Sequence, residues 1–192
     1  MVKLTGLKKI KTAVFISGTG SNLQSLIKFS KLKLSPISVD LIVSNTHLAK
    51  GLRYANQFAI KKEIFDFKNH KKAEKDISIL LKKKKIKLIC LAGFMRILSK
   101  NFIKKFNKKI INIHPSLLPK YKGLNTHFRA ITNKDKFTGC TVHYVTAKLD
   151  SGKIIIQKKI KITTRDTPTS LAKKVLKQEH KLYPAAIMKI FN

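Results

Sequence analysis

Short apolar runs alternate with amphipathic stretches along most of the chain. The apolar runs predict strands at 13–16, 37–44, 86–92 and 109–114, with a short one at 63–67, and the stretches between them predict helices at about 22–33, 51–59, 71–84 and 99–106. The run at 86–92 is apolar except for Lys87, which is typical of a strand buried on both faces of a sheet. Strands that alternate with helices indicate an α/β fold, with a mostly parallel sheet and helices on both faces.

The end of the chain departs from this alternation. Strands are predicted at 139–145 and 153–162 without a clear helix between them, so we expect them to pair antiparallel and to make the sheet mixed. A long helix at 168–191 follows, with Pro168 in its first turn. We interpret residues 1–11 as a short basic extension and residues 12–192 as a single domain, a length that suits one hydrophobic core.

The charge of the chain is unusual. It has 42 Lys and Arg residues against 9 Asp and Glu, a formal net charge of +33, which indicates nucleic acid or another anionic partner. However, only 4 of the 42 are Arg, the residue that nucleic-acid readers favour, and the lysines are spread from end to end. A genome rich in A and T would produce the same composition. We prefer that interpretation, with weak non-specific nucleic-acid binding as a side effect.

The apolar runs and the two cysteines limit the cellular compartment and the kind of chemistry that we expect for this chain. The longest apolar run, 88–95, is far shorter than the roughly 20 residues that span a membrane, so no membrane contact is predicted. Cys90 and Cys140 lie in predicted strands, so we expect core residues in a reducing compartment, the cytoplasm, rather than nucleophiles. No cysteines or histidines have the spacing of a zinc site, and no metal is predicted.

A glycine-rich loop follows the first predicted strand and opens a helix. In Ser17-Gly-Thr-Gly-Ser-Asn22, two glycines allow a ligand to approach closely and the helix start offers free N–H groups. Leu23 stands where a dinucleotide-binding loop has its third glycine, and no Lys completes a Walker A loop. The loop predicts either one phosphate held by Gly20, Ser21 and Asn22 or an ordinary strand-to-helix turn.

Two polar residues end the strand predicted at 109–114. Asn112 and His114 are two positions apart, so their side chains project from the same face of the strand. The rigid turn Pro115-Ser-Leu-Leu-Pro119 follows, which favours a ligand site over a hydrogen-bonded corner. Both side chains can donate hydrogen bonds to one point, as stabilisation of an oxyanion requires.

Three further residues are scarce in type or unusual in position. Asp150 lies in a turn, where it either serves turn formation or lies beside His114, favours the charged imidazole and raises its pKa. Glu179 falls on the apolar stripe of the last helix. It either contacts a hydroxyl or amine of a ligand, or it pairs with a lysine or lies at an exposed edge of the stripe. Arg96 follows the buried strand and suits a carboxylate, or it is a surface Arg kept by chance.

Five segments together resemble the phosphoribosylglycinamide formyltransferase family. They are Ile16-Ser-Gly-Thr-Gly-Ser-Asn-Leu-Gln24, Leu91-Ala-Gly-Phe-Met-Arg-Ile-Leu98, Asn112-Ile-His-Pro-Ser-Leu-Leu-Pro119, the turn Leu149-Asp-Ser-Gly152, and Gln178-Glu-His180. They occur in the order typical of that family and extend over about residues 12–191. The resemblance implies a Rossmann-like formyltransferase fold. It also implies that a formyl group passes from the co-substrate 10-formyltetrahydrofolate to the amine of 5-phosphoribosylglycinamide, in purine (IMP) biosynthesis.

The resemblance implies a role for each candidate residue. Gly20, Ser21 and Asn22 would hold the substrate phosphate, and Glu179 would meet its ribose. Asn112 and protonated His114 would stabilise the oxyanion, while Asp150 would keep His114 charged and help proton transfer. The folate would contact Met95, Arg96, Ile97, Leu98, Asn112, Thr146, Ala147, Lys148, Leu149 and Asp150, with Arg96 near its glutamate end.

Three positions depart from the family pattern. Asn125 stands where a second His is usual, Lys153 where Pro commonly follows the glycine, and Leu176 where a polar residue is common. We expect these changes to affect substrate affinity more than chemistry.

Three other protein classes share some of these features. Methionyl-tRNA formyltransferases share the Asn-x-His and Ser-Leu-Leu-Pro elements, but they carry a C-terminal domain for which this chain has no residues. Formyltetrahydrofolate hydrolases usually have an additional N-terminal domain. The non-enzyme alternative is a basic nucleic-acid-binding protein, against which 8% aromatic residues and no Trp leave few side chains for base stacking.

Overall fold

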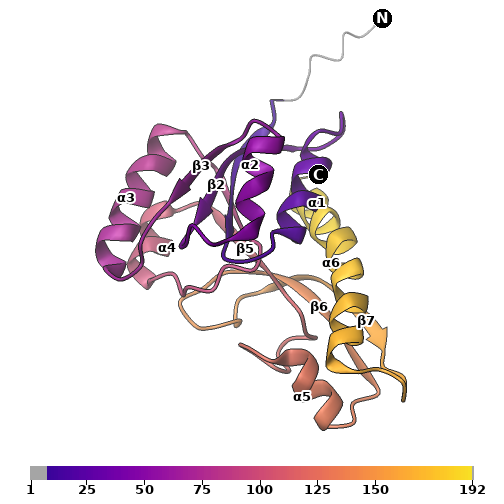
Figure 1. The fold of residues 1–192 in the computed structure, drawn as a ribbon. Coiled ribbons are helices and arrows are strands. Elements are labelled where there is room, and N and C mark those ends of the chain that lie inside the picture. Colours follow the sequence, from indigo (N-terminus) through magenta and orange to yellow (C-terminus); the bar gives the residue numbers. More distant parts are fainter. Residues whose placement is uncertain (1–7, 192) are drawn as a thin grey trace, which may run out of the picture.

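Seven strands form one sheet in the order β3-β2-β1-β4-β5-β6-β7 in the computed structural model, which describes residues 8–191 (Figure 1). The strands are β1 (Ile10–Ile16), β2 (Ile37–Ser44), β3 (Lys61–Ile64), β4 (Leu88–Leu91), β5 (Lys109–His114), β6 (Phe137–Tyr144) and β7 (Ile154–Lys161). Strands β1 to β5 pair in parallel, whereas β6 and β7 join antiparallel. The predicted mixed α/β sheet is therefore confirmed.

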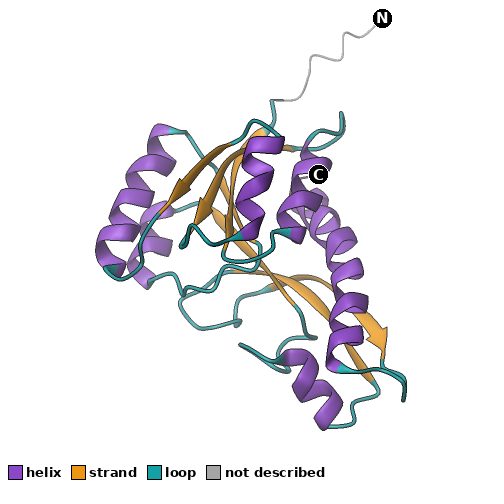
Figure 2. Cartoon of the chain, in the orientation of Figure 1, coloured by secondary structure: helices purple, strands orange, loops and turns teal. Residues whose placement is uncertain are grey.

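Helices cover both faces of this sheet (Figure 2). They are α1 (Ser21–Ser30), the short 3₁₀ helix η1 (Lys50–Leu52), α2 (Arg53–Gln57), α3 (His70–Lys83), α4 (Lys100–Phe106), α5 (Thr126–Thr132) and α6 (Pro168–Phe191). Ser99 caps α4 as predicted, because its side chain accepts a hydrogen bond from the Phe102 N–H. No helix in the described part of the chain has both the length and the apolar character needed to cross a membrane.

Alternate residues of the central strands enter two separate cores. In β1, Val14 and Ile16 pack into the core that includes α1, α2 and α6, whereas Ala13 and Phe15 pack into the core that includes α3 and α4. Because both sets of side chains are buried, the central strands appear in the sequence as continuous apolar runs.

Helix α6 packs into one of these cores and contacts two central strands. Its predicted apolar stripe is buried and comprises Leu171, Val175, Leu182 and Ala186. The Tyr183 hydroxyl lies 3.0 Å from the carbonyl oxygen of Leu91 and 3.1 Å from that of Ile111. One buried hydroxyl therefore joins α6 to both β4 and β5.

Three elements differ from those predicted. Strand β1 begins at Ile10, inside the stretch 1–11 that we interpreted as an extension, and residues 1–7 lie outside the described residues. Strand β3 lies at 61–64 rather than 63–67, because it is an exposed edge strand with charged side chains and has no apolar pattern. The pattern does not predict α5, which buries only Thr126 and Ala130 and so lacks an apolar stripe.

Candidate active site

The candidate residues gather at the edge of the sheet where its parallel strands end. Strands β1, β4 and β5 are neighbours, so loops 17–22 and 93–98 lie beside the end of β5. Ser17 joins the two loops, since its N–H donates to Gly93 O at 3.1 Å and its hydroxyl accepts from the Met95 N–H at 2.8 Å. The chain order reverses between β1 and β4, which is where open α/β sheets bind ligands.

The glycine-rich loop presents free backbone N–H groups. Gly20 precedes α1 with a φ of 75°, a left-handed conformation that favours glycine. A Cβ on Gly20 would lie 2.6 Å from the Cα of Gly51. The two segments can therefore cross this closely only because both residues are glycine. Within residues 8–191, the N–H groups of residues 21–23 donate to no protein acceptor. Free N–H groups at the positive end of a helix dipole suit an anion such as phosphate.

Asn22 and Glu179 form a buried polar pair beside this loop. Asn22 Nδ2 donates to Glu179 Oε2 at 2.6 Å, while the buried Asn22 Oδ1 has no partner within residues 8–191. Burial raises the pKa of the Glu179 carboxyl, although the hydrogen bond from Asn22 opposes this effect. Glu179 forms no ion pair with any described residue, which argues against its predicted alternative role as half of an ion pair.

The side chains of His114 and Asp150 meet at the end of β5. Nε2 of the buried His114 lies 2.8 Å from the carbonyl oxygen of Tyr121, and because a carbonyl only accepts, Nε2 carries a hydrogen. Nδ1 of His114 lies 3.4 Å from Asp150 Oδ2, which also accepts a hydrogen bond from the Gly123 N–H at 2.9 Å. Asp150 has a φ of 43°, so it both forms the tight turn and faces the imidazole. The structure therefore brings together two residues that are 36 positions apart in the sequence.

Burial reverses the pKa shift that the sequence predicts for His114. It lowers the pKa of His114 below the ordinary value of 6.5, and this effect exceeds the opposing effects of the hydrogen bond to Tyr121 and the charge of Asp150. The predicted increase is therefore wrong, because the sequence shows the carboxylate but not the depth of burial. Burial also opposes ionisation of Asp150, but the nearby His143 side chain and the hydrogen bond from the Gly123 N–H outweigh it and lower the pKa of Asp150. At neutral pH the pair consists of a neutral imidazole and a carboxylate.

His143 is a further member of this cluster that the sequence analysis does not identify. It lies on β6, directly opposite Asn112 on β5. Its Nδ1 donates to the carbonyl oxygen of Tyr144 at 2.9 Å, and its Nε2 lies 3.2 Å from Asn112 Nδ2, which can only donate. The same Nε2 lies 3.6 Å from Asp150 Oδ1. Only the antiparallel register of β5 and β6, which the apolar pattern does not contain, brings His143 to this point.

Two exposed loops flank the cluster. In loop 93–98, the residues Met95 and Ile97 are each 62% exposed, and Arg96 is exposed as well. Leu98 is buried in the core with α3 and α4, so its side chain is not available to a ligand. Residues 146–149 are exposed too, and Leu149 is half exposed. The loops thus offer an apolar rim and an accessible guanidinium group.

Comparison with known proteins decides the family to which this site belongs. Residues 10–187 match the formyl transferase family. The chain is a member of that family. This formyl transferase is 38% identical over 177 residues to the phosphoribosylglycinamide formyltransferase of Escherichia coli (strain K12), a match that covers 91% of this chain and 84% of that protein. The crystal structure of phosphoribosylglycinamide formyltransferase from Brucella melitensis superposes with a TM-score of 0.90 and 41% identity, over 95% of this chain and 96% of that one.

Some relatives of this formyl transferase are much longer. The human trifunctional purine biosynthetic protein adenosine-3 is 42% identical over 183 residues, which cover 94% of this chain. The match covers 18% of the human protein, so the chain spans less than a fifth of the length of that relative.

The three departures from the family pattern lie at different depths in this formyl transferase. Asn125 is exposed at the start of α5 with a φ of 57°, and its side chain does not cap the helix. Lys153 is exposed, and its carbonyl oxygen accepts a hydrogen bond from the Tyr144 N–H at 3.0 Å. Leu176 is partly buried on α6. Among the described residues, none of their side chains has a hydrogen bond to Asn112 or His114.

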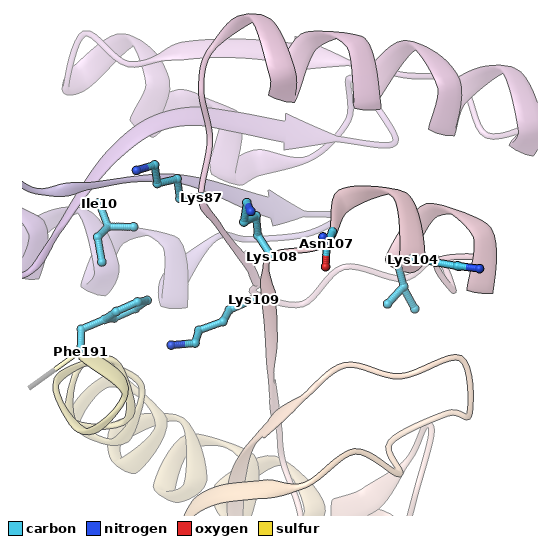
Figure 3. A pocket seen from close by; sticks show the side chains of 8 residues that line it. Ile10, Lys87, Lys104, Asn107, Lys108, Lys109 and Phe191 are labelled. Atoms are coloured by element: carbon cyan, nitrogen blue, oxygen red, sulfur yellow. The ribbon is translucent and has the colours of Figure 1, made fainter.

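A cavity of about 710 Å³ lies at the opposite edge of the sheet (Figure 3). It is lined by Ile10, Lys87, Ile103, Lys104, Asn107, Lys108, Lys109 and Phe191. Ile10 begins β1, Lys87 precedes β4 and Lys109 begins β5, so the cavity lies at the amino ends of these strands. Since lysines are spread over the whole chain, four of them around one cavity do not indicate a specific ligand. The candidate catalytic residues lie at the carboxyl ends of the strands, away from it.

Proposed function

We propose that this chain transfers a formyl group from 10-formyltetrahydrofolate to the amine of 5-phosphoribosylglycinamide. The observation that carries the proposal is the convergence of Asn112 and the His114–Asp150 pair at a sheet edge that also presents free N–H groups for a phosphate. The names of the bacterial relatives support the same acceptor and the same transferred group. We also propose the cytoplasm as the compartment, since the free cysteines Cys90 and Cys140 are buried core residues.

The phosphate of the acceptor substrate is assigned to Gly20, Ser21 and Asn22. Its charge would meet the helix dipole of α1 and the N–H groups that have no protein acceptor. Glu179 is assigned to the ribose hydroxyls, because its carboxyl is held beside the loop by Asn22. The unpartnered Asn22 Oδ1 is a second acceptor for a hydroxyl or amine of the substrate.

The formyl donor fits the two exposed loops. Met95, Ile97 and Leu149 offer an apolar surface to a ring system, and the exposed Arg96 suits a glutamate carboxylate. The remaining donor contacts are assigned to Leu98, Thr146, Ala147, Lys148 and Asp150, with the contact of Leu98 made by its backbone. When bound, the donor supplies the formyl carbon, and attack by the substrate amine turns the formyl oxygen into an oxyanion.

Asn112 and His114 then stabilise that oxyanion. One amide hydrogen of Asn112 is occupied by His143, which leaves the other to donate to the oxyanion. Nδ1 of the neutral His114 accepts the proton that the attacking amine loses, and the resulting imidazolium donates to the oxyanion. When this intermediate collapses, the bond between the formyl carbon and N10 of the folate breaks, and the imidazolium returns its proton to N10 of the departing tetrahydrofolate. Asp150, 3.4 Å away, stabilises this imidazolium, and the Tyr121 carbonyl holds its other nitrogen.

Formyl transfer between these two substrates, measured with wild type and His114→Ala side by side, tests the proposal. We expect wild-type turnover and a decrease of kcat by about 10²–10³-fold in the variant, which is typical for loss of one oxyanion donor. Methionyl-tRNA and water serve as alternative acceptors in the same assay. A folded wild-type protein that formylates neither the ribonucleotide nor these acceptors would contradict the assignment.

A further inference from the structure

One short backbone stretch contacts both members of the His114–Asp150 pair. The carbonyl of Tyr121 accepts the Nε2 hydrogen of His114 at 2.8 Å, and the N–H of Gly123 donates to Asp150 Oδ2 at 2.9 Å. Residues 121–123 therefore hold the imidazole and the carboxylate at the same time. A shift of this stretch would change how the two groups face each other.

The Tyr121 side chain anchors this stretch to the residues that follow α5. Its hydroxyl donates to Asp135 Oδ2 at 2.8 Å and accepts from Asn133 Nδ2 at 2.8 Å. Lys120 Nζ lies 2.6 Å from Asp135 Oδ1, so two consecutive residues bind the same carboxylate. The Asp135 side chain is only 12% exposed, whereas the Lys120 side chain is 57% exposed, so solvent reaches the ammonium group more than the carboxylate.

The backbone of Tyr121 is in a conformation that requires such support. Its φ of 57° lies in the left-handed region, which disfavours a residue with a large side chain. The residue is nevertheless buried, and the guanidinium carbon of Arg129 lies 4.8 Å from the centre of its ring. These side-chain contacts offset the backbone strain and keep the carbonyl directed at His114.

We propose that Tyr121 and Asp135 are positioning residues for the His114–Asp150 pair. The inference rests on the formyl transfer proposed above. Neither residue is assigned a contact with substrate: their hydroxyl–carboxylate contact fixes residues 121–123, and that backbone fixes the imidazole and the carboxylate. Burial opposes ionisation of Asp135, but hydrogen bonds from Lys120 and Tyr121 outweigh it and lower its pKa, so the anchor is charged at neutral pH.

Two conservative variants test this inference. Tyr121→Phe removes only the hydroxyl, and Asp135→Asn removes only the charge. We expect kcat to fall about tenfold in each, with both KM values within about twofold of wild type, because misplacement of catalytic groups acts on the transition state. The pKa of His114 in the kcat–pH profile should decrease, because the hydrogen bond to Tyr121 raises it in the wild type.

A matched control separates positioning from stability. The carboxylate of Asp166 also pairs with a lysine, Lys174, at 2.6 Å, and its side chain is 3% exposed, against 12% for Asp135. Asp166→Asn should lower the melting temperature while leaving kcat and the pH profile unchanged. If Tyr121→Phe does not fold, Asn133→Ala removes the other partner of the hydroxyl and should reproduce its kinetic effects.

The NMR signal of the His114 Nε2 hydrogen provides a readout without substrate. It is assigned by its absence in His114→Asn, and we expect its exchange with solvent to be faster in Tyr121→Phe and Asp135→Asn than in wild type. If both variants keep the kcat, the pH profile and the exchange rate of the wild type, the positioning role is overturned and the proposed function stays intact. An inactive wild type would overturn the proposed function, and the exchange rates would still decide the positioning role.

Discussion

The amide nitrogen of Asn112 lies 3.2 Å from Nε2 of His143, across the antiparallel pair β5 and β6. The carbonyl of Tyr144 accepts the hydrogen of the other ring nitrogen of His143. In this arrangement the nitrogen of the Asn112 amide points toward His143 and the oxygen away from it. An amide that is to donate to an oxyanion requires this orientation.

We therefore expect His143→Ala to lower kcat by about tenfold. Asn112→Ala removes the donor itself and should lower kcat more, by about 10²–10³-fold. His143→Ala leaves the amide of Asn112 present but free to rotate. Single-turnover kinetics with saturating substrates measure the effect on the chemical step. His143→Gln keeps an acceptor oxygen and should recover part of the loss, whereas equal rates in all three proteins would show that the orientation of the amide is fixed elsewhere.

The crossing of Gly20 and Gly51 leads to a prediction about substrate affinity. A Cβ on Gly51 would lie 2.8 Å from the Cα of Gly20, so Gly51→Ala must displace the loop that carries the free N–H groups. We expect the KM of the phosphate-bearing substrate to rise about tenfold, equivalent to about 1.4 kcal/mol, with a much smaller change in the KM of the folate. A Cβ on Gly18 meets no atom within 4 Å, so Gly18→Ala should have the smaller effect. Equal effects of the two variants would contradict this account.

Three histidines make stability dependent on pH. Burial lowers the pKa of His114, His127 and His180 below 6.5, and buried nitrogens of the last two have no described partner. The unfolded chain therefore binds more protons below about pH 6.5, and the stabilisation present above that pH is lost as the pH falls through the lowered pKa values of the folded state. Urea unfolding at pH 7.5 and pH 5.5 should give a lower free energy of unfolding at pH 5.5. His180→Phe should reduce this difference, and an unchanged difference would contradict the assignment.

The net charge of +33 predicts weak RNA binding that is independent of the active site. If several lysines contact phosphates, the affinity for single-stranded RNA should fall at least about 10³-fold between 50 and 200 mM salt. Asn112→Ala should bind RNA as wild type does. Fluorescence anisotropy across a salt series measures both, and affinity that persists at high salt would indicate a specific RNA site instead.

Much of the site follows from local sequence signals. The loop at 17–22, the end of β5 and the buried Glu179 are each marked by residues within one short segment, so their positions are predictable from the chain alone. His143 is not, because its place depends on the register between two strands that are joined by more than 20 residues. The pKa of His114 is not predictable either, because two opposing effects of burial and charge must be compared in three dimensions. Helix α5 is not predictable from the sequence because it buries too few residues to produce an apolar stripe.

The hydroxyl of Ser17 donates to Asn45 and accepts from the Met95 N–H, so one group belongs to both the phosphate loop and the loop assigned to the folate. A ligand that shifts residues 17–22 therefore also shifts the amide of Met95. If either proposed substrate shifts this contact when it binds, it changes the affinity for the other. Thermodynamic reciprocity then requires that the factor by which the ribonucleotide changes the affinity for folate equals the factor by which folate changes the affinity for the ribonucleotide.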